Sequence, residues 1–153
     1  MEAFALGFET GAAVTYDSDS DGIPDWWTQQ YFGHPTGQAG DLSRPGDDPD
    51  GDGRTNAQEY ITGTNPKVAD VTASQLNINR TSPTTLTLTF QTIRDRLYQI
   101  FYSSSLTGPW LPAGSASSGT GSTGTYIDNG SDTGSPPTTG QKRFYKLQVS
   151  LIP

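Results

Sequence analysis

Apolar residues in the C-terminal half of this chain recur at every second position, in short runs separated by turn-rich segments. The longer runs begin at Leu76, Leu86, Tyr98 and Tyr145, and a brief one surrounds Tyr126. Successive side chains of a strand point to opposite faces, so this alternation predicts strands with one buried face. Several such strands with turns between them indicate two packed antiparallel sheets. We therefore expect a mainly β protein with a small antiparallel β-sandwich over residues 71–153.

Two short helices are predicted before the sandwich, over residues 25–33 and 56–63. Each ends at a glycine, which is the residue that most readily terminates a helix. Their apolar residues can pack against each other, because side chains four positions apart share a helix face. The residues expected to form this small core are Trp26, Trp27, Tyr31, Ala57, Tyr60 and Ile61.

Two other segments have weaker patterns. Phe4, Leu6 and Phe8 alternate with small residues and predict a short strand within residues 1–16, which has no hairpin partner nearby in the sequence. We expect that strand to pair with a distant part of the chain or with a neighbouring copy. The tract 113–140 is almost free of apolar residues and is expected to be a flexible loop or hairpin tip.

Charge is concentrated in one region of the 153-residue chain. Residues 17–59 contain ten acids and two bases, a net charge of −8, whereas the rest contains six acids and seven bases, a net charge of +1, which accounts for the total of −7. The absence of a basic stripe argues against nucleic-acid binding. No apolar run is long enough to span a membrane.

The acidic residues follow the ligand spacing of a twelve-residue calcium loop, once in residues 17–28 (loop one) and again in residues 48–59 (loop two). Carboxylates stand at positions 1, 3 and 5, glycine stands at position 6, and Asp or Asn stands at position 9. Residues 17–70 are therefore expected to bind two Ca²⁺ ions, with room for more if acids are shared. The expected ligands are Asp17, Asp19, Asp21, the Ile23 carbonyl and Asp25 in loop one, and Asp48, Asp50, Asp52, the Arg54 carbonyl, Asn56 and Glu59 in loop two.

The two loops differ at position 12, where a bidentate acid normally completes the coordination. Loop two has Glu59 there, but loop one has Thr28. Loop one is therefore either a weaker site or is completed by an acid from elsewhere, such as Asp41 or Asp47.

Other candidate sites have less support in the sequence. Trp110 is a candidate carbohydrate contact, in a row with Tyr102 and Tyr126, although a place in the core is favoured. Asn79 and Asn129 begin sequons for N-glycosylation. His34, the only histidine, has no nucleophile near it in the sequence. The single Asp-Thr-Gly-Ser motif at Asp132 lacks the second aspartate that aspartic-protease chemistry needs.

Several motifs together resemble a known type of module. They are DSDSDGIPDWW at residues 17–27, YFG at 31–33, DPDGDG at 48–53 and GTNP at 63–66, followed by RLYQI at 96–100, SLTGPW at 105–110 and RFYK at 143–146. The first four resemble calcium-loop modules near the C-terminal ends of large secreted proteins of environmental bacteria, which are similar to thrombospondin type 3 and dockerin repeats. The others resemble a small immunoglobulin- or fibronectin-III-like sandwich. The resemblance covers roughly residues 16–153 and implies a non-catalytic extracellular module in which calcium is structural.

These features define two functional hypotheses. The first is an extracellular or cell-surface structural or adhesive module, stabilised by calcium, that acts on other copies of itself or on a larger parent protein. In one form of this hypothesis it is a self-assembling filament subunit. The absence of cysteine is consistent with an exported bacterial protein that uses calcium in place of disulfides. The alternative is a carbohydrate-binding accessory module of a secreted enzyme, with a polysaccharide as its partner.

Overall fold

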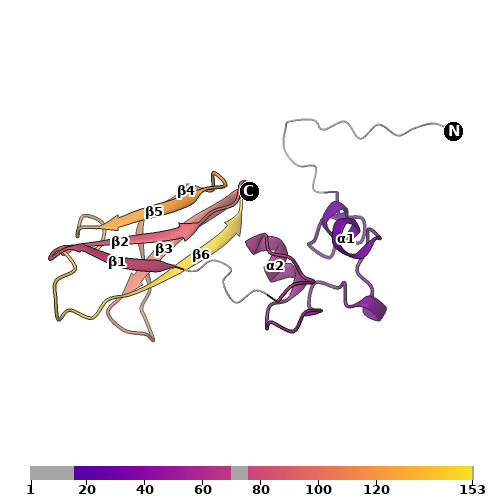
Figure 1. The fold of residues 1–153 in the computed structure, drawn as a ribbon, viewed down its shortest axis with the longest axis horizontal. Helices are drawn as coiled ribbons and strands as arrows, with labels where there is room; N and C mark the ends of the chain where they lie inside the picture. Colours follow the sequence, from indigo (N-terminus) through magenta and orange to yellow (C-terminus); the bar gives the residue numbers. More distant parts are fainter. Residues whose placement is uncertain (1–15, 70–75, 153) are drawn as a thin grey trace.

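The computed structural model describes residues 16–69 and 76–152. The first range forms a helical unit with two acidic loops, and the second forms a β-sandwich beside it (Figure 1). The predicted N-terminal strand and the predicted boundary at residues 70–71 lie outside the described residues, and both stay predictions. The elements in chain order are α1 (Asp25–Phe32), the 3-10 turn η1 (Ala39–Asp41), α2 (Asn56–Thr62), β1 (Asn77–Ser82), β2 (Thr85–Gln91), β3 (Arg96–Ser103), β4 (Leu111–Ser118), β5 (Thr123–Asp128) and β6 (Phe144–Leu151).

Local signals explain where both predicted helices begin and end. The Thr55 side chain accepts from the Gln58 backbone N–H and the Gln58 side chain accepts from the Thr55 N–H, so a capping box starts α2. Gly33 and Gly63 end α1 and α2 with φ of 85° and 73°. This left-handed conformation is unfavourable for residues with a Cβ, so glycine is preferred there. Neither helix of the described ranges has the length and apolarity needed to cross a membrane.

A small aromatic core joins the two helices. Ile23, Trp27 and Tyr60 are buried, with Tyr31, Phe32 and Ala57 packed around them. The rings of Trp27 and Tyr60 meet edge to face, with centroids 6.1 Å apart. Trp26 lies at the edge of this core: it is 47% exposed, but its ring meets that of Tyr60 edge to face, with centroids 6.3 Å apart.

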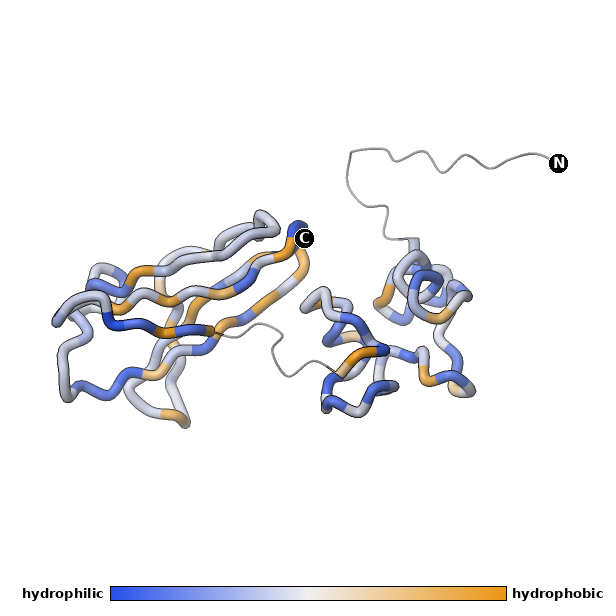
Figure 2. The backbone as a smooth tube through the Cα atoms, viewed as in Figure 1, coloured by the Kyte–Doolittle hydropathy of each residue, from blue (hydrophilic) through white to orange (hydrophobic). Residues whose placement is uncertain are grey.

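The sandwich confirms the predicted mainly β fold with two antiparallel sheets. One sheet has the order β1-β2-β5 and the other the order β4-β3-β6. Strand β2, with the sequence TLTLTFQ, buries every second side chain, and the alternation is visible along the strands in Figure 2. The core residues are Leu86, Leu88, Phe90, Tyr98, Ile100 and Ala113.

The tract 113–140 contains more regular structure than the sequence predicts. Most of β4 lies in it, as does all of β5, so the expected loop is in part a pair of strands. Of the side chains on β4, only that of Ala113 is buried. The residues of β4 have almost no apolar pattern of their own. This strand forms because its backbone pairs with the edge of β3.

Arg96 of β3 connects the sandwich to the helical unit. Its Nε and Nη2 donate to the backbone carbonyls of Ile61 and Tyr60, both at 2.7 Å. These carbonyls belong to the last turn of α2, which contains no basic residue of its own. Arg96 of the sandwich therefore provides the cation that favours the C-terminus of this helix. Ile61, which was expected to meet α1, lies instead at this contact.

Candidate metal centre

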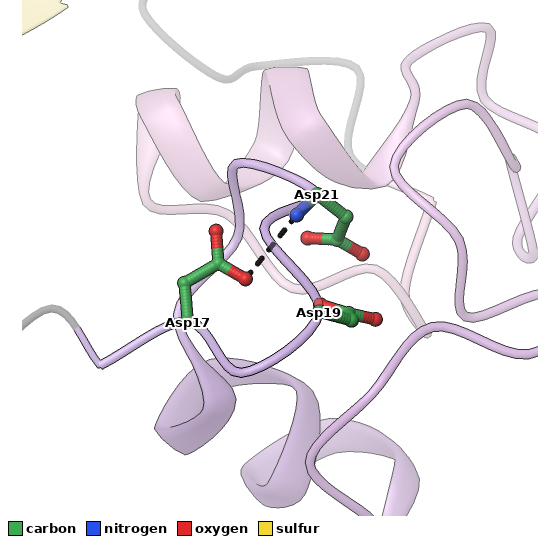
Figure 3. A group of neighbouring side chains, drawn as sticks. All are labelled: Asp17, Asp19 and Asp21. Atoms are coloured by element: carbon green, nitrogen blue, oxygen red, sulfur yellow. Dashed lines mark hydrogen bonds between the residues drawn. The ribbon is translucent and has the colours of Figure 1, made fainter.

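Loop one gathers the three predicted carboxylates of Asp17, Asp19 and Asp21. One oxygen from each lies within 4.8 Å of the others, inside the loop drawn in Figure 3. Backbone N–H groups hold the carboxylates in place. Asp17 Oδ2 accepts from Gly22 N at 2.9 Å, and Asp21 Oδ1 accepts from Ile23 N at 2.9 Å. The hydrogen bond from Gly22 lowers the pKa of Asp17, whereas burial and the neighbouring carboxylates raise that of Asp21.

Loop two repeats this geometry. Asp48, Asp50 and Asp52 form a second triad that meets the same 4.8 Å condition. Asp48 Oδ2 accepts from Gly53 N and Asp52 Oδ1 accepts from Arg54 N, each at 2.9 Å. These bonds join positions 1 to 6 and 5 to 7, as in loop one, so the internal duplication predicted from the sequence extends to individual contacts.

Glycine is required at position 6 of both loops. Gly22 and Gly53 have φ of 93° and 91°, in the left-handed region. The bend lets position 6 donate its N–H back to the carboxylate at position 1, which closes the triad. The sequence spacing alone predicted this role.

Three buried oxygens of loop two have no hydrogen-bond partner: Asp50 Oδ2, Asn56 Oδ1 and Glu59 Oε2. An unpaired buried polar atom costs about 1–3 kcal/mol, and more when charged. All three belong to positions that the spacing assigns as ligands, namely 3, 9 and 12. A hard divalent cation would satisfy them, so the residues present fit the metal.

Glu59 is the most buried acid of loop two, with an exposed fraction of 0%. Burial, together with the nearby Asp50 and Asp52, raises its pKa to about 7. Its Oε1 accepts from Thr64 Oγ1 at 3.2 Å, which leaves Oε2 without a partner. The counterpart in loop one, Thr28, is also buried but offers no charge. Each acidic triad can hold a metal ion, and loop two has the more complete donor set.

The side chains at position 9 have different hydrogen-bond partners in the two loops. Asp25 Oδ1 accepts from the backbone N–H and the hydroxyl of Ser18, which ties the end of loop one to its start. The Asn56 side-chain amide donates to the Leu42 and Arg44 carbonyls at 2.8 and 2.7 Å. Asn56 therefore fastens loop two to the segment that connects the loops.

That connecting segment also contacts loop one, which sequence reasoning did not predict. Gly37 N donates to Asp19 Oδ2 at 3.0 Å. A Cβ at Gly37 would lie 2.9 Å from Asp21 Oδ2 and 3.1 Å from the Arg44 Cα, so a larger residue would have to displace the Asp21 carboxylate or the backbone. The two acids considered as extra ligands have other partners: Asp41 Oδ2 lies 2.6 Å from His34 Nε2, and Asp47 Oδ2 accepts from Arg44 N. The metal-binding group identified in loop one contains neither of them.

The candidate carbohydrate residues do not form an exposed row. Tyr102 and Tyr126 pack against the sandwich core, and Trp110 is partly buried with Lys146 Nζ 5.0 Å from its ring centroid. A pocket of about 190 Å³ lies beside Tyr102, but Trp110 does not line it. Asn79 and Asn129, the sequon residues, are both exposed.

A buried ionic cluster holds the segment that contains the Asp-Thr-Gly-Ser motif. Asp128, with a fully buried side chain, accepts from Thr133, Arg143 and Tyr145. Burial raises the pKa of Asp128, but these hydrogen bonds outweigh it and the net pKa is lowered. Thr133 of the motif thus forms hydrogen bonds to both members of the Asp128–Arg143 ion pair. Asp132 is not part of this cluster and accepts a hydrogen bond from the Tyr126 hydroxyl.

The structure therefore assembles two acidic triads at the predicted positions, each of which could hold a metal ion, on a fold of the predicted class. Sequence reasoning missed Gly37, Arg96 and Asp128, which act through contacts distant in the chain. A glycine beside the acidic loops was the one available signal, since Arg96 and Asp128 follow no motif. Comparison with known proteins does not assign the chain to a family: no family model, no curated protein and no solved structure matches it.

Proposed function

We propose that this chain is a non-catalytic, calcium-stabilised structural or adhesive module that works outside the cell or at its surface. The observation that carries the proposal is the set of buried, unpartnered oxygens on Asp50, Asn56 and Glu59. They lie at ligand positions of a loop whose spacing suits a cation with six to eight oxygen ligands. A buried carboxyl among like charges is unfavourable in the folded protein unless a cation neutralises it.

Calcium is favoured over other metals by the donor set. Both triads consist of carboxylates, and neither contains histidine or cysteine. Zinc and most transition metals prefer nitrogen or sulfur ligands. Magnesium requires near-ideal octahedral geometry and keeps several waters, whereas calcium tolerates irregular oxygen ligands.

The position of loop two supports a structural role for the ion. Glu59 begins the last turn of α2, and Arg96 of β3 bonds to the end of the same turn. An ion at loop two would therefore fix the helix that contacts the sandwich. The helices, with eight and seven residues, are also too short to open and present a binding groove as calcium sensors do.

Calorimetric titration of the metal-free chain with Ca²⁺ tests the proposal. We expect two bound ions with the loop-two ion tighter, and weaker binding of Mg²⁺. Glu59→Gln should weaken the tighter site, whereas Asp132→Asn, which also removes one carboxylate charge but at an exposed position of the sandwich, should leave it unchanged. No heat of calcium binding to the folded chain would contradict the proposal.

Self-assembly into a surface filament is the specific form of this function that we propose. The sandwich has exposed strand edges, and added strands pair readily with such edges. Electron microscopy of the purified chain in calcium is the direct test. The alternative of a carbohydrate-binding module has less support, because Lys146 occupies one face of the Trp110 ring.

A further inference from the structure

Strand β6 is an edge strand that pairs with β3 alone among the described strands, and α2 packs beside part of it. It pairs with β3 over eight residues, from Arg96↔Leu151 to Ser103↔Phe144, and in the sheet order β4-β3-β6 no other described strand lies beside it. Strands β4 and β5 are edges of different sheets and are joined by the short turn 119–122, which closes that side of the sandwich. The edges β1 and β6 are therefore left on the opposite side (Figure 1).

The hydrophobic core is incompletely covered on this open side. Tyr145, Leu147 and Val149 of β6 face the core but are only partly buried. Their neighbours on β3, Tyr98 and Ile100, are 3% and 4% exposed. On β1, Ile78 pairs with the fully buried Leu88 and so faces the same way, yet it is 49% exposed. The apolar side chains of β1 and β6 are thus only partly covered, and we call this open side of the core the gap.

Strand β6 also lacks the devices that usually protect an edge. The registers of β1 and β4 shift, and β4 contains Pro112, whereas β6 has a regular register and no proline. Its one lysine, Lys146, lies over the rings of Phe101 and Trp110, across the outer face of its sheet. A long, regular and apolar edge of this kind is suited to accept another strand.

The chain itself contains a segment with the matching pattern. Phe4, Leu6 and Phe8 alternate with Ala5 and Gly7, so a strand formed by residues 4–8 would place three apolar side chains on one face. The spacing of alternate residues in that strand would equal the spacing of the partly buried residues on β6. Such side chains would fill the gap, while backbone hydrogen bonds would pair the edge.

The geometry favours β6 of a second copy over β6 of the same chain. Tyr16 accepts from Asp25 N at the start of α1, and α1 lies at the end of the molecule away from the sandwich (Figure 1). Residues 8–16 span at most about 28 Å when extended. A compact unit of the size of residues 16–69 is about 26 Å across. The extended length of residues 8–16 is therefore only enough to cross the helical unit. It would not also let residues 4–8 run beside β6 of the same chain.

We propose that residues 4–8 of one copy add as a strand to β6 of the next, with Phe4, Leu6 and Phe8 between β1 and β6. This inference rests on the self-assembly proposed above and identifies its contact. The donor segment precedes Tyr16 of the helical unit, whereas the acceptor β6 belongs to the sandwich, so the contact joins different parts of two copies and is head-to-tail. Repeated without closure, it builds a filament.

Neighbouring residues of the donor strand point to opposite faces, which allows a matched pair of substitutions in the full chain. Leu6→Asp places a charge on the face that enters the gap, whereas Ala5→Asp places the same charge on the opposite face. In calcium, the unsubstituted chain and Ala5→Asp should form filaments by electron microscopy, and Leu6→Asp should remain monomeric by light scattering. Filaments from Leu6→Asp, or equal loss in both variants, would overturn the proposal.

Hydrogen exchange identifies the acceptor and the source of the strand. Amides of β6 should exchange faster in Leu6→Asp than in the unsubstituted chain, and a peptide of residues 1–10 added to Leu6→Asp should slow them again. A monomeric unsubstituted chain with protected β6 amides would mean insertion into its own sandwich and would overturn the role of a second copy. The calcium-dependent rise in melting temperature should persist in Leu6→Asp, so failure of assembly is distinguishable from failure of the calcium site.

Discussion

The guanidinium of Arg96 lies over the ring of Tyr60, 5.2 Å from its centroid, while its Nη2 donates to the Tyr60 carbonyl at 2.7 Å. Tyr60 directly follows Glu59, the acid that closes loop two. A single residue of the sandwich thus contacts the residue next to the candidate metal ligand. This relationship links the occupancy of loop two to the position of the sandwich.

Replacing Arg96 should weaken the contact between the helical unit and the sandwich and lower the stability of the chain. Arg96→Met removes charged hydrogen bonds to two carbonyls, so we expect a loss of about 1.5–3 kcal/mol in the free energy of unfolding. Arg94→Met, on an exposed side chain two residues away, is the matched control. Denaturant unfolding followed by tryptophan fluorescence gives the free energy of unfolding of both variants. Equal stability of the two variants would show that the contact contributes nothing.

The two loops should contribute unequally to calcium-dependent stability. Asp52→Ala should reduce the calcium-dependent rise in melting temperature more than Asp17→Ala, because loop two has the buried acid Glu59 where loop one has Thr28. The quantity to compare is the increment between calcium and chelator, which separates the metal from the hydrogen bonds these acids accept without it. A larger effect of Asp17→Ala would reverse the proposed ranking.

Gly37 should be irreplaceable beside loop one. Gly37→Ala would put a methyl group 2.9 Å from Asp21 Oδ2 and 3.1 Å from the Arg44 Cα, and overpacking of this kind costs about 1–3 kcal/mol. Gly40→Ala is the control, because a Cβ there meets nothing within 4 Å. We expect weaker calcium binding at loop one in Gly37→Ala alone, measured by calorimetric titration. Matching affinities in both variants would contradict the close approach.

The free energy of unfolding of the sandwich should fall at acid pH because of Asp128. Its folded pKa is lowered from 3.8, so the ionised form stabilises the fold above about pH 4, and this stability is lost as pH falls through the lowered value. Breaking the buried pair with Arg143 by Asp128→Asn should cost about 3–5 kcal/mol and flatten this dependence. Unfolding free energies between pH 5 and pH 2, compared with those of Asp132→Asn at an exposed site, provide the check. An unchanged acid dependence in Asp128→Asn would contradict this role.

Residues whose role is local were predictable from the sequence. The alternation of β2 indicates its buried face, because each side chain is placed by the backbone period. The triads follow from the spacing of Asp48, Asp50 and Asp52, since a tight loop brings alternate residues together. The capping box and the two terminal glycines likewise depend only on nearby residues.

Residues whose role depends on tertiary contacts were not predictable. Strand β4 forms on the edge of β3 although its residues are mostly exposed. Arg96 occupies a core-facing position of β3, where a cation finds its partners only because α2 lies there. Ile78 follows the alternation of the run that begins at Leu76, but it lies on an edge strand and is half exposed. In each case the neighbour, rather than the residue, decides the outcome.

Thermal unfolding of the full chain with calcium and with chelator tests the central claim most directly. At calcium concentrations about 100 times the dissociation constant, each site adds about 2.7 kcal/mol, which corresponds to a rise of about 5–10 °C in melting temperature for a chain of this size. We predict a rise of at least this size in calcium, which is greatly reduced in Glu59→Gln. Identical melting temperatures in calcium and in chelator would contradict a structural role for the ion.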